Sequence, residues 1–99
     1  MYSIELRHQA KSQKAEIVAW YEDINPRYAR EFVDELEQTI EKYLTKTPYQ
    51  WRKTAGNKRR ILLKKYPYKV IYTINETQKQ VQILAIWHHK RKEWQKAKH

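Results

Sequence analysis

Side chains that could act on a phosphate group are concentrated in the second half of this 99-residue chain. Cleavage of RNA through its 2′-hydroxyl needs a proton acceptor, cations that stabilise the extra charge on phosphorus, and an acid for the leaving oxygen. The guanidinium groups of Arg60 and Arg91 suit the second task, because they stay charged and match phosphate oxygens in a bidentate way. A histidine suits the proton transfers, since its pKa lies near neutrality.

Two adjacent histidines, His88 and His89, end a β-rich run, and Arg91 follows them. If the strand pleat continues through both histidines, they point to opposite faces, so at most one can serve a given site. The competing interpretation is structural, in which such a histidine anchors the sheet by hydrogen bonding. Arg60 has a similar alternative, as a solvated charge on a strand edge.

A second group of cations surrounds Gly56, and aromatic residues are interleaved with it. Cations in a loop can bind backbone phosphates or an acidic target, and an exposed Trp51 can stack on bases. The alternatives are solubilising surface charge and packing of the loop against the helices. The predicted binding set comprises Trp51, Lys53, Lys58, Arg59 and Lys90.

The two halves of the chain carry opposite charge. Residues 1–45 contain 6 Lys/Arg and 9 Asp/Glu, whereas residues 46–99 contain 15 and 2, so nets of −3 and +13 give the total of +10. A surface this basic concentrates polyanions or an acidic partner segment. The charge distribution therefore favours a protein directed at nucleic acid or at the ribosome.

Composition also excludes several classes of protein. Without cysteine the chain can form neither disulfides nor thiolate zinc sites, and His8 and His99 lack a spacing that suggests a metal site. We therefore expect no metal and no cofactor. Because no signal peptide is visible and no apolar run approaches the ~20 residues of a membrane span, we expect a cytoplasmic protein with no membrane contact.

Hydrophobic periodicity predicts the elements that would position these residues. Alternation over residues 2–7 indicates a strand, and two helical stripes separated at Asn25-Pro26 indicate a helix hairpin. Three β-rich runs follow, joined by short connections that favour antiparallel hairpins. The predicted fold is α+β, in the order β-α-α-β-β-β, with the helix hairpin packed on one face of a mainly antiparallel four-stranded sheet. The helices are expected over residues 10–24 and 26–44, and the later strands around 61–63, 70–74 and 81–87.

The motifs of the second half resemble those of the RelE/ParE superfamily, the toxins of type II toxin–antitoxin (plasmid stabilisation) modules. The likeness rests on RRILLKKYPYKVIYTI, followed by VQILAIWHHKR and a nearby Trp94. The family pattern is a basic loop, an arginine, a Leu-rich strand, an aromatic-Pro-Tyr turn, a strand with a tyrosine and a last strand ending in His-x-x-Arg. The matching positions are Lys58, Arg59, Arg60, Tyr66, Pro67, Tyr68, Tyr72, His88 and Arg91.

This resemblance implies one toxin domain over residues 1–99, with a basic tail from about residue 90, held inactive by a cognate acidic antitoxin. Two mechanisms are compatible with it. In the first, the chain is a ribosome-dependent mRNA endoribonuclease whose catalytic residues are Arg60, His88 and Arg91. In the second, the chain is a non-catalytic poison of a target such as DNA gyrase, and the same cations are docking contacts. Outside toxin–antitoxin biology, the remaining alternative is a basic RNA- or DNA-binding module.

The C-terminal segment departs from the pattern of the family's ribosome-dependent nucleases. Those relatives typically carry a tyrosine or another histidine close to the C-terminus, after the arginine. In this chain the corresponding segment, KEWQKAKH, has no tyrosine and leaves Trp94 and His99. Because the indole of Trp94 is not a usable acid or base, the departure favours the ParE-like branch or a nuclease that relies on His88. The charge of the basic half favours contact with RNA and the ribosome instead. The oligomeric state is left open by the sequence.

Overall fold

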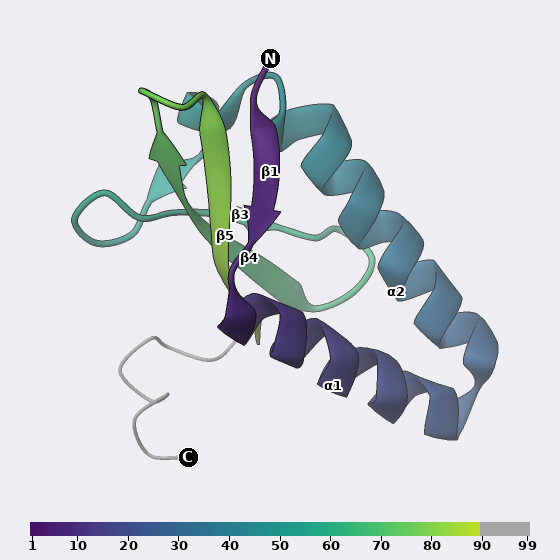
Figure 1. The fold of residues 1–99 in the computed structure, drawn as a ribbon. Coiled ribbons are helices and arrows are strands. Elements are labelled where there is room, and N and C mark those ends of the chain that lie inside the picture. The colour runs from purple at the N-terminus through teal and green to yellow at the C-terminus, as the bar shows by residue number, and fades with distance from the viewer. Residues whose placement is uncertain (90–99) are drawn as a thin grey trace.

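A computed structural model describes residues 1–89 and contains two helices that pack on one face of a five-stranded sheet (Figure 1). The strand order is β1-β5-β4-β3-β2, with β1 parallel to β5 and every other pair antiparallel. No helix in this part of the chain is long and apolar enough to cross a membrane. The elements are β1 (Ser3–Leu6), α1 (His8–Ile24), α2 (Pro26–Thr39), a π-helical turn η1 (Ile40–Leu44), a 3₁₀ turn η2 (Pro48–Gln50), β2 (Arg52–Lys53), β3 (Arg59–Leu62), β4 (Tyr68–Asn75) and β5 (Gln80–His88).

The predicted α+β class and the helix hairpin are confirmed, but the sheet is mixed and has five strands rather than four. The additional strand, β2, is only two residues long and has no hydrophobic alternation to reveal it. It forms because the polar loop turns back on itself, with the N–H of Thr54 donating to the carbonyl of Lys58 at 2.9 Å. Gly56 permits this turn by adopting a φ of +56°.

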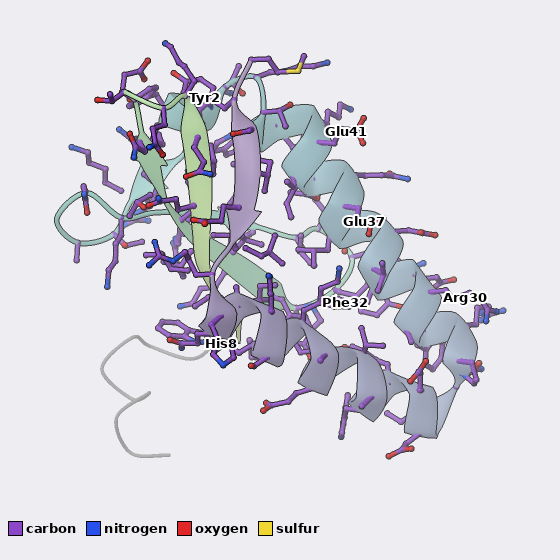
Figure 2. All side chains as sticks on the ribbon, viewed as in Figure 1. Tyr2, His8, Arg30, Phe32, Glu37 and Glu41 are labelled. Atoms are coloured by element: carbon purple, nitrogen blue, oxygen red, sulfur yellow. The ribbon has the colours of Figure 1, made fainter. Side chains whose placement is uncertain are left out.

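The helix hairpin is fixed by its connecting residues. The side chain of Asn25 accepts a hydrogen bond from the N–H of Arg27 at 3.0 Å, and Pro26 occupies the first helical position. In α2 the buried residues are Ala29, Phe32, Leu36 and Thr39. Figure 2 shows Phe32 between the helices and the sheet, whereas Arg30, Glu37 and Glu41 point outward.

The apolar stripe that the sequence predicts along α1, formed by Ile17, Trp20, Tyr21 and Ile24, is only partly covered. Ile17 and Tyr21 pack against the core, but Trp20 and Ile24 remain 57% and 55% exposed. The connection between the helices lies away from the strands, so the last turns of α1 have no sheet beneath them (Figure 1). The stripe therefore identified the helix correctly and overestimated how much of it is buried.

The sheet divides its side chains between two apolar clusters. On the helix face, Ile61, Val70, Tyr72, Val81 and Ile83 join the main core with the helices. On the opposite side, which we call the far face, Ile71, Ala85 and Trp87 form a separate buried cluster. Successive residues of a strand point to opposite faces of the sheet, so the remaining strand residues can be assigned to the helix face or the far face by alternation.

Acidic residues of α2 hold the loop between β3 and β4. The Glu35 carboxylate accepts the backbone N–H groups of Lys64, Lys65 and Tyr66 at 2.7, 2.8 and 2.9 Å. Glu31 accepts the Tyr66 hydroxyl at 2.9 Å and pairs with the Lys65 ammonium at 3.1 Å. The acidic helix therefore binds a basic turn of the same molecule.

Replacement of Glu35 by alanine should destabilise the fold by about 1–3 kcal/mol, because three loop N–H groups lose a charged acceptor. Chemical denaturation of the purified chain measures this change. Glu37→Ala is the matched control, since Glu37 is exposed and its ion pair with Lys14 has a separation of 4.0 Å. The control should change the free energy of unfolding by less than about 0.5 kcal/mol. Equal effects of the two variants would contradict the anchoring role of Glu35.

Candidate functional site

A β-bulge in the pairing of β4 with β5 determines which residues share a face. Ile71 pairs with Ala85, whereas the next residue, Tyr72, pairs with Ile83, so Leu84 has no partner. One extra residue reverses the alternation of everything that follows it in the strand. Val81 and Ile83 therefore lie on the helix face, Ala85 and Trp87 on the far face, and Ile86 again on the helix face.

The bulge separates two residues of the predicted catalytic set. His88 pairs with Tyr68, whose ring lies in the helix-face core, and the two rings make an edge contact at 5.8 Å. Arg60 pairs with Ile71, whose side chain lies on the far face. The structure thus does not bring Arg60 and His88 to one surface.

His88 lies at the exposed end of β5, where its ring stacks on that of His89 at 5.2 Å. The chain bends after it, and the N–H of His89 donates to the carbonyl of Pro67 at 2.8 Å. Because the strand ends here, the opposite orientations predicted for these two histidines are replaced by stacked rings. The third member of the catalytic set, Arg91, and Lys90 of the binding set lie outside the described residues.

Arg60 has an arginine as its cross-strand neighbour. Arg52 of β2 pairs with Arg60 of β3, so both guanidinium groups extend from the far face. Neither guanidinium makes an ion pair or hydrogen bond with a residue of the described segment 1–89. Like charges directly opposite each other in a sheet are unfavourable, and an anion relieves their repulsion. The sequence-based site omitted Arg52, although its position beside Lys53, facing the Arg59-Arg60 pair across the loop, was a usable signal.

Arg59 points to the other face and is engaged within the molecule. Its guanidinium donates to the carbonyls of Tyr49 and Trp51 at 3.0 and 2.8 Å, and lies 5.3 Å from the centre of the Tyr49 ring. The hydroxyl of Tyr72, its partner on β4, donates to the carbonyl of Pro48 at 2.7 Å. Two neighbouring strands therefore hold the backbone of residues 48–51.

The remaining predicted contacts surround this anchored turn. Lys53 is exposed and pairs with Arg59 across β2 and β3, while Lys58 is half-buried at the base of the loop. Trp51 is half-buried and packs on Tyr43 with ring centres 5.2 Å apart. The contacts of Trp51 therefore agree with the interpretation that it packs the loop against the helices. Trp51 also lines a groove.

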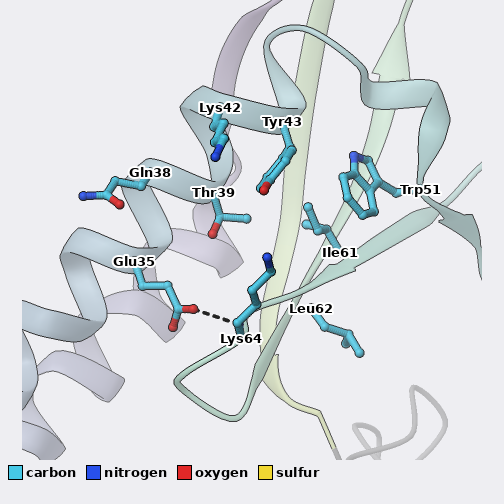
Figure 3. Close-up of a pocket in the computed structure, with 9 residues that line it drawn as sticks. All are labelled: Glu35, Gln38, Thr39, Lys42, Tyr43, Trp51, Ile61, Leu62 and Lys64. Atoms are coloured by element: carbon cyan, nitrogen blue, oxygen red, sulfur yellow. Dashed lines mark hydrogen bonds between the residues drawn. The ribbon is translucent and has the colours of Figure 1, made fainter.

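This groove lies between the end of α2 and the outer edge of β3 (Figure 3). It has a volume of about 250 Å³. Its apolar part is formed by Tyr43, Trp51 and Ile61, with Thr39 beside them, and Lys42 and Lys64 stand at its rim. Leu62 reaches the groove from β3 and is 46% exposed, which is unusual for a residue of that size in a strand.

A cluster around Glu76 fixes the other end of the same turn. The hydroxyls of Tyr2 and Tyr49 donate to one oxygen of Glu76 at 2.8 and 2.7 Å, and the Lys79 ammonium contacts the other. These hydrogen bonds, led by that of Lys79, lower the pKa of Glu76 to about 2. The cluster joins the N-terminus, η2 and the β4–β5 turn, which are remote in sequence.

The tyrosines of the family-like motif are poor candidates for proton transfer. Burial is the main cause that raises the pKa values of Tyr66, Tyr68 and Tyr72, and that of Tyr66 reaches about 12. The Tyr66 and Tyr72 hydroxyls are already donating, to Glu31 and to the Pro48 carbonyl. All three side chains therefore remain neutral near pH 7, and two of them act as hydrogen-bond donors that hold the fold.

Comparison with known protein families gives one match over most of the chain. Residues 4–93 match the family described as the ParE toxin of the type II toxin-antitoxin system parDE. A search of curated protein sequences gives no match.

Solved structures with the same arrangement of helices and strands include several toxins. A chain of the chromosomal ParDE system from P. aeruginosa has a TM-score of 0.76 and 21% identity, over 89% of this chain and 96% of that one. A chain of the RelBE2 toxin–antitoxin complex from Mycobacterium tuberculosis gives 0.61 and 15%, over 88% and 90%. The isolated E. coli RelE toxin gives 0.58 and 11%, over 99% and 95%.

Adjacent arginines should differ in their effect on stability. Arg59→Ala removes two carbonyl hydrogen bonds and a ring contact, so it should cost about 1–3 kcal/mol. Arg60→Ala removes one member of a like-charged pair and should change stability by less than about 0.5 kcal/mol. Thermal and chemical denaturation of both variants measure the difference. A larger loss for Arg60→Ala than for Arg59→Ala would contradict these assignments.

Acid should weaken the fold partly through Glu76. Because the pKa of Glu76 is lowered on folding, its contribution is present above its unfolded pKa of 4.5 and is lost as the pH falls towards about 2. In Glu76→Gln the melting temperature should therefore fall less steeply across this interval than in the wild type. The control Glu22→Gln, on the exposed surface of α1, should keep the wild-type slope. A wild-type slope for Glu76→Gln would refute the role of the cluster.

Proposed function

This chain belongs to the ParE toxin family of type II toxin–antitoxin systems, and we propose that it inhibits growth by binding DNA gyrase without cleaving RNA. The docking surface is the far face around Arg52 and Arg60. A cognate acidic antitoxin holds the toxin inactive.

The observation that carries the non-catalytic mechanism is the separation of Arg60 from His88. A nuclease needs its proton-transfer group and its phosphate-binding cation at the same phosphate, within hydrogen-bond reach of the reacting atoms. Here the two side chains belong to opposite faces of one sheet. Tyr68, whose ring contacts His88, has a raised pKa and stays neutral near pH 7, so it does not act as a proton acceptor.

The arginine pair supports a docking role. Two guanidinium groups that repel each other in the isolated toxin gain free energy when a carboxylate or phosphate binds between them. Arg52 and Arg60 meet this description, because they are paired in register and neither contacts an acidic side chain among residues 1–89. Charge on a docking surface also accelerates association with an oppositely charged target.

Solved relatives support an antitoxin partner. The structures that share this fold include a RelBE2 toxin–antitoxin complex and the intact E. coli RelBE toxin–antitoxin complex. Their fold-level similarity is compatible with a comparable partner for this chain, and its net charge of +10 favours an acidic one.

Two assays run in parallel test this mechanism. The purified toxin should inhibit supercoiling by gyrase and should leave mRNA intact in a translating extract, as read by primer extension. His88→Ala should retain toxicity within about twofold, whereas loss of a group that transfers protons typically costs about 10²–10⁴-fold. Arg60→Glu should weaken gyrase inhibition at least roughly tenfold, a loss of about 1.4 kcal/mol in binding.

Arg30→Glu is the matched charge-reversal control, because Arg30 is exposed on α2 and points outward (Figure 2). It should inhibit gyrase like the wild type. Site-specific mRNA cuts that vanish in His88→Ala would overturn the proposal in favour of the endoribonuclease. Normal supercoiling together with intact mRNA would exclude both mechanisms.

A further inference from the structure

The second half of α1 carries an apolar surface that the sheet does not cover. Trp20 and Ile24 are 57% and 55% exposed, and neither belongs to the apolar core that the described residues form. We propose that the basic segment 90–99 of the same molecule docks on this surface, with Trp94 packed against Trp20 and Ile24. The inference goes beyond the proposed function, because it concerns a contact within the toxin.

The first observation is that the two exposed side chains form one patch. Residues four apart on a helix are neighbours on its surface, so Trp20 and Ile24 lie side by side. Single exposed apolar residues are ordinary on protein surfaces, whereas a contiguous patch often marks a place where another segment binds. Covering a tryptophan and an isoleucine is favourable, and it needs an occupant with a large apolar side chain of its own.

The second observation is the charge around the patch. Residues 16–24 contain three carboxylates and no Lys or Arg. Glu16 and Asp23 flank the position of Trp20 at helical spacing, and both are exposed. Neither forms an ion pair with a residue of the described segment 1–89. The last turn of α1 also has no basic residue to compensate the negative end of the helix dipole. The surface therefore selects a cationic occupant.

The third observation is the composition of the segment that follows β5. Residues 90–99, KRKEWQKAKH, contain five Lys or Arg, one Glu and a single large apolar residue, Trp94. This composition complements both the charge and the apolar character of the patch. A second copy that presented its own α1 patch would instead bring like charges together, and an acidic partner would be repelled in the same way.

The fourth observation is that β5 ends beneath α1. The N–H of Ile86 donates to the side-chain oxygen of Gln13 at 2.7 Å. Ring contacts connect the end of β5 to the patch, from His88 to Tyr68 at 5.8 Å, from Tyr68 to Tyr21 at 6.3 Å and from Tyr21 to Trp20 at 5.1 Å. Trp94 is the fifth residue after His89, and five extended residues span up to about 18 Å. The segment can therefore reach the patch of its own molecule.

Docking at α1 would give two cations of the sequence-based sites a role in the fold. Lys90 and Arg91 begin the segment, which leaves β5 from the side of His88 and Tyr68. Arg60 extends from the far face instead. The charge of Lys90 and Arg91 would thus compensate the acidic end of α1, and Arg91 would not complete a phosphate site with Arg60.

A nitroxide placed in the segment reports this contact directly. Because the chain has no cysteine, Ala97→Cys gives the full-length toxin a single labelling site and removes no charge. In ¹⁵N spectra, the indole N–H of Trp20 and the amide of Ile24 should lose most of their intensity, and reduction of the label should restore it. The amides of Arg52 and Arg60 should keep their intensity.

Variants of the patch test its apolar part. In the labelled toxin, Trp20→Ser with Ile24→Ser should abolish the loss of intensity at the neighbouring amides of α1. Leu62→Ser is the matched control, because Leu62 is another large apolar residue, 46% exposed, on a different part of the surface. The control should leave the intensity loss in α1 unchanged.

Charge variants test the acidic part. Glu16→Gln with Asp23→Asn should reduce the intensity loss in α1, because it removes the carboxylates that pair with the segment. Glu37→Gln with Glu41→Gln makes the same change in net charge at exposed positions of α2 and η1. This control should keep the intensity loss of the parent.

A double-mutant cycle measures the same contact by its effect on unfolding. Trp20→Ala and Trp94→Ala should each raise the unfolding equilibrium constant. The product of the two single effects should exceed the effect of the double variant at least roughly threefold, the coupling expected for an aromatic pair. The effects of Leu62→Ala and Trp94→Ala should multiply without coupling.

Three outcomes would each overturn the inference. They are intensity losses at Arg60 and Leu62 in place of α1, a cycle without coupling between Trp20 and Trp94, and equal effects of the two charge variants. A mixture of ¹⁵N-labelled unmodified toxin with unlabelled toxin that carries the nitroxide should show no loss in α1. A loss there would assign the contact to a second molecule and also overturn the inference. None of these measurements uses gyrase or mRNA, so their failure is distinguishable from failure of the proposed function.

Discussion

The faces on which the last residues of β5, from Ala85 to His88, lie depend on one unpaired residue, Leu84. Had β5 alternated without interruption from Val81, residues 85 and 87 would face the helices and His88 would share the far face with Arg60. The bulge instead sends Trp87 to the far-face cluster and His88 to the side of Tyr68. A single extra residue thereby separates two side chains that a nuclease would need together.

Neighbouring cations have different roles because strand geometry sends them in opposite directions. Arg59 serves as an internal donor to carbonyls of the 48–51 turn, and together with Tyr72 it positions Trp51 at the groove. Arg60, one residue later, extends from the far face beside Arg52. The role of Arg59 has a physical basis, since a planar guanidinium with several N–H donors can bind more than one carbonyl oxygen at once. Adjacent residues thus differ in role: Arg59 holds the fold, whereas Arg60 is the residue proposed to contact the target.

The opposite charges of the two halves are used within the molecule as well as toward partners. Glu31 and Glu35 of α2 bind the basic turn at residues 64–66, and Glu76 gathers Tyr2, Tyr49 and Lys79. These carboxylates neutralise or anchor loops that frame the groove. The arginines Arg52 and Arg60 of the far face form no ion pair with a residue of the described segment, so their charge remains available to an anion.

The sequence by itself determined the class of fold, the helix hairpin, the strands β1, β3, β4 and β5, and the family, because hydrophobic periodicity, the Asn-Pro break and an ordered set of motifs are local signals. It also identified the cations of the basic half as the functional candidates, Arg60 among them. It did not reveal the parallel pairing of β1 with β5 or the short β2, since register between distant segments leaves no local pattern. Only the tertiary structure decided that Arg59 is an internal anchor, that Arg52 faces Arg60, and that His88 lies on the other side of the sheet. Those outcomes depend on strand pairing and on a bulge, both of which are fixed by packing between segments far apart in the chain.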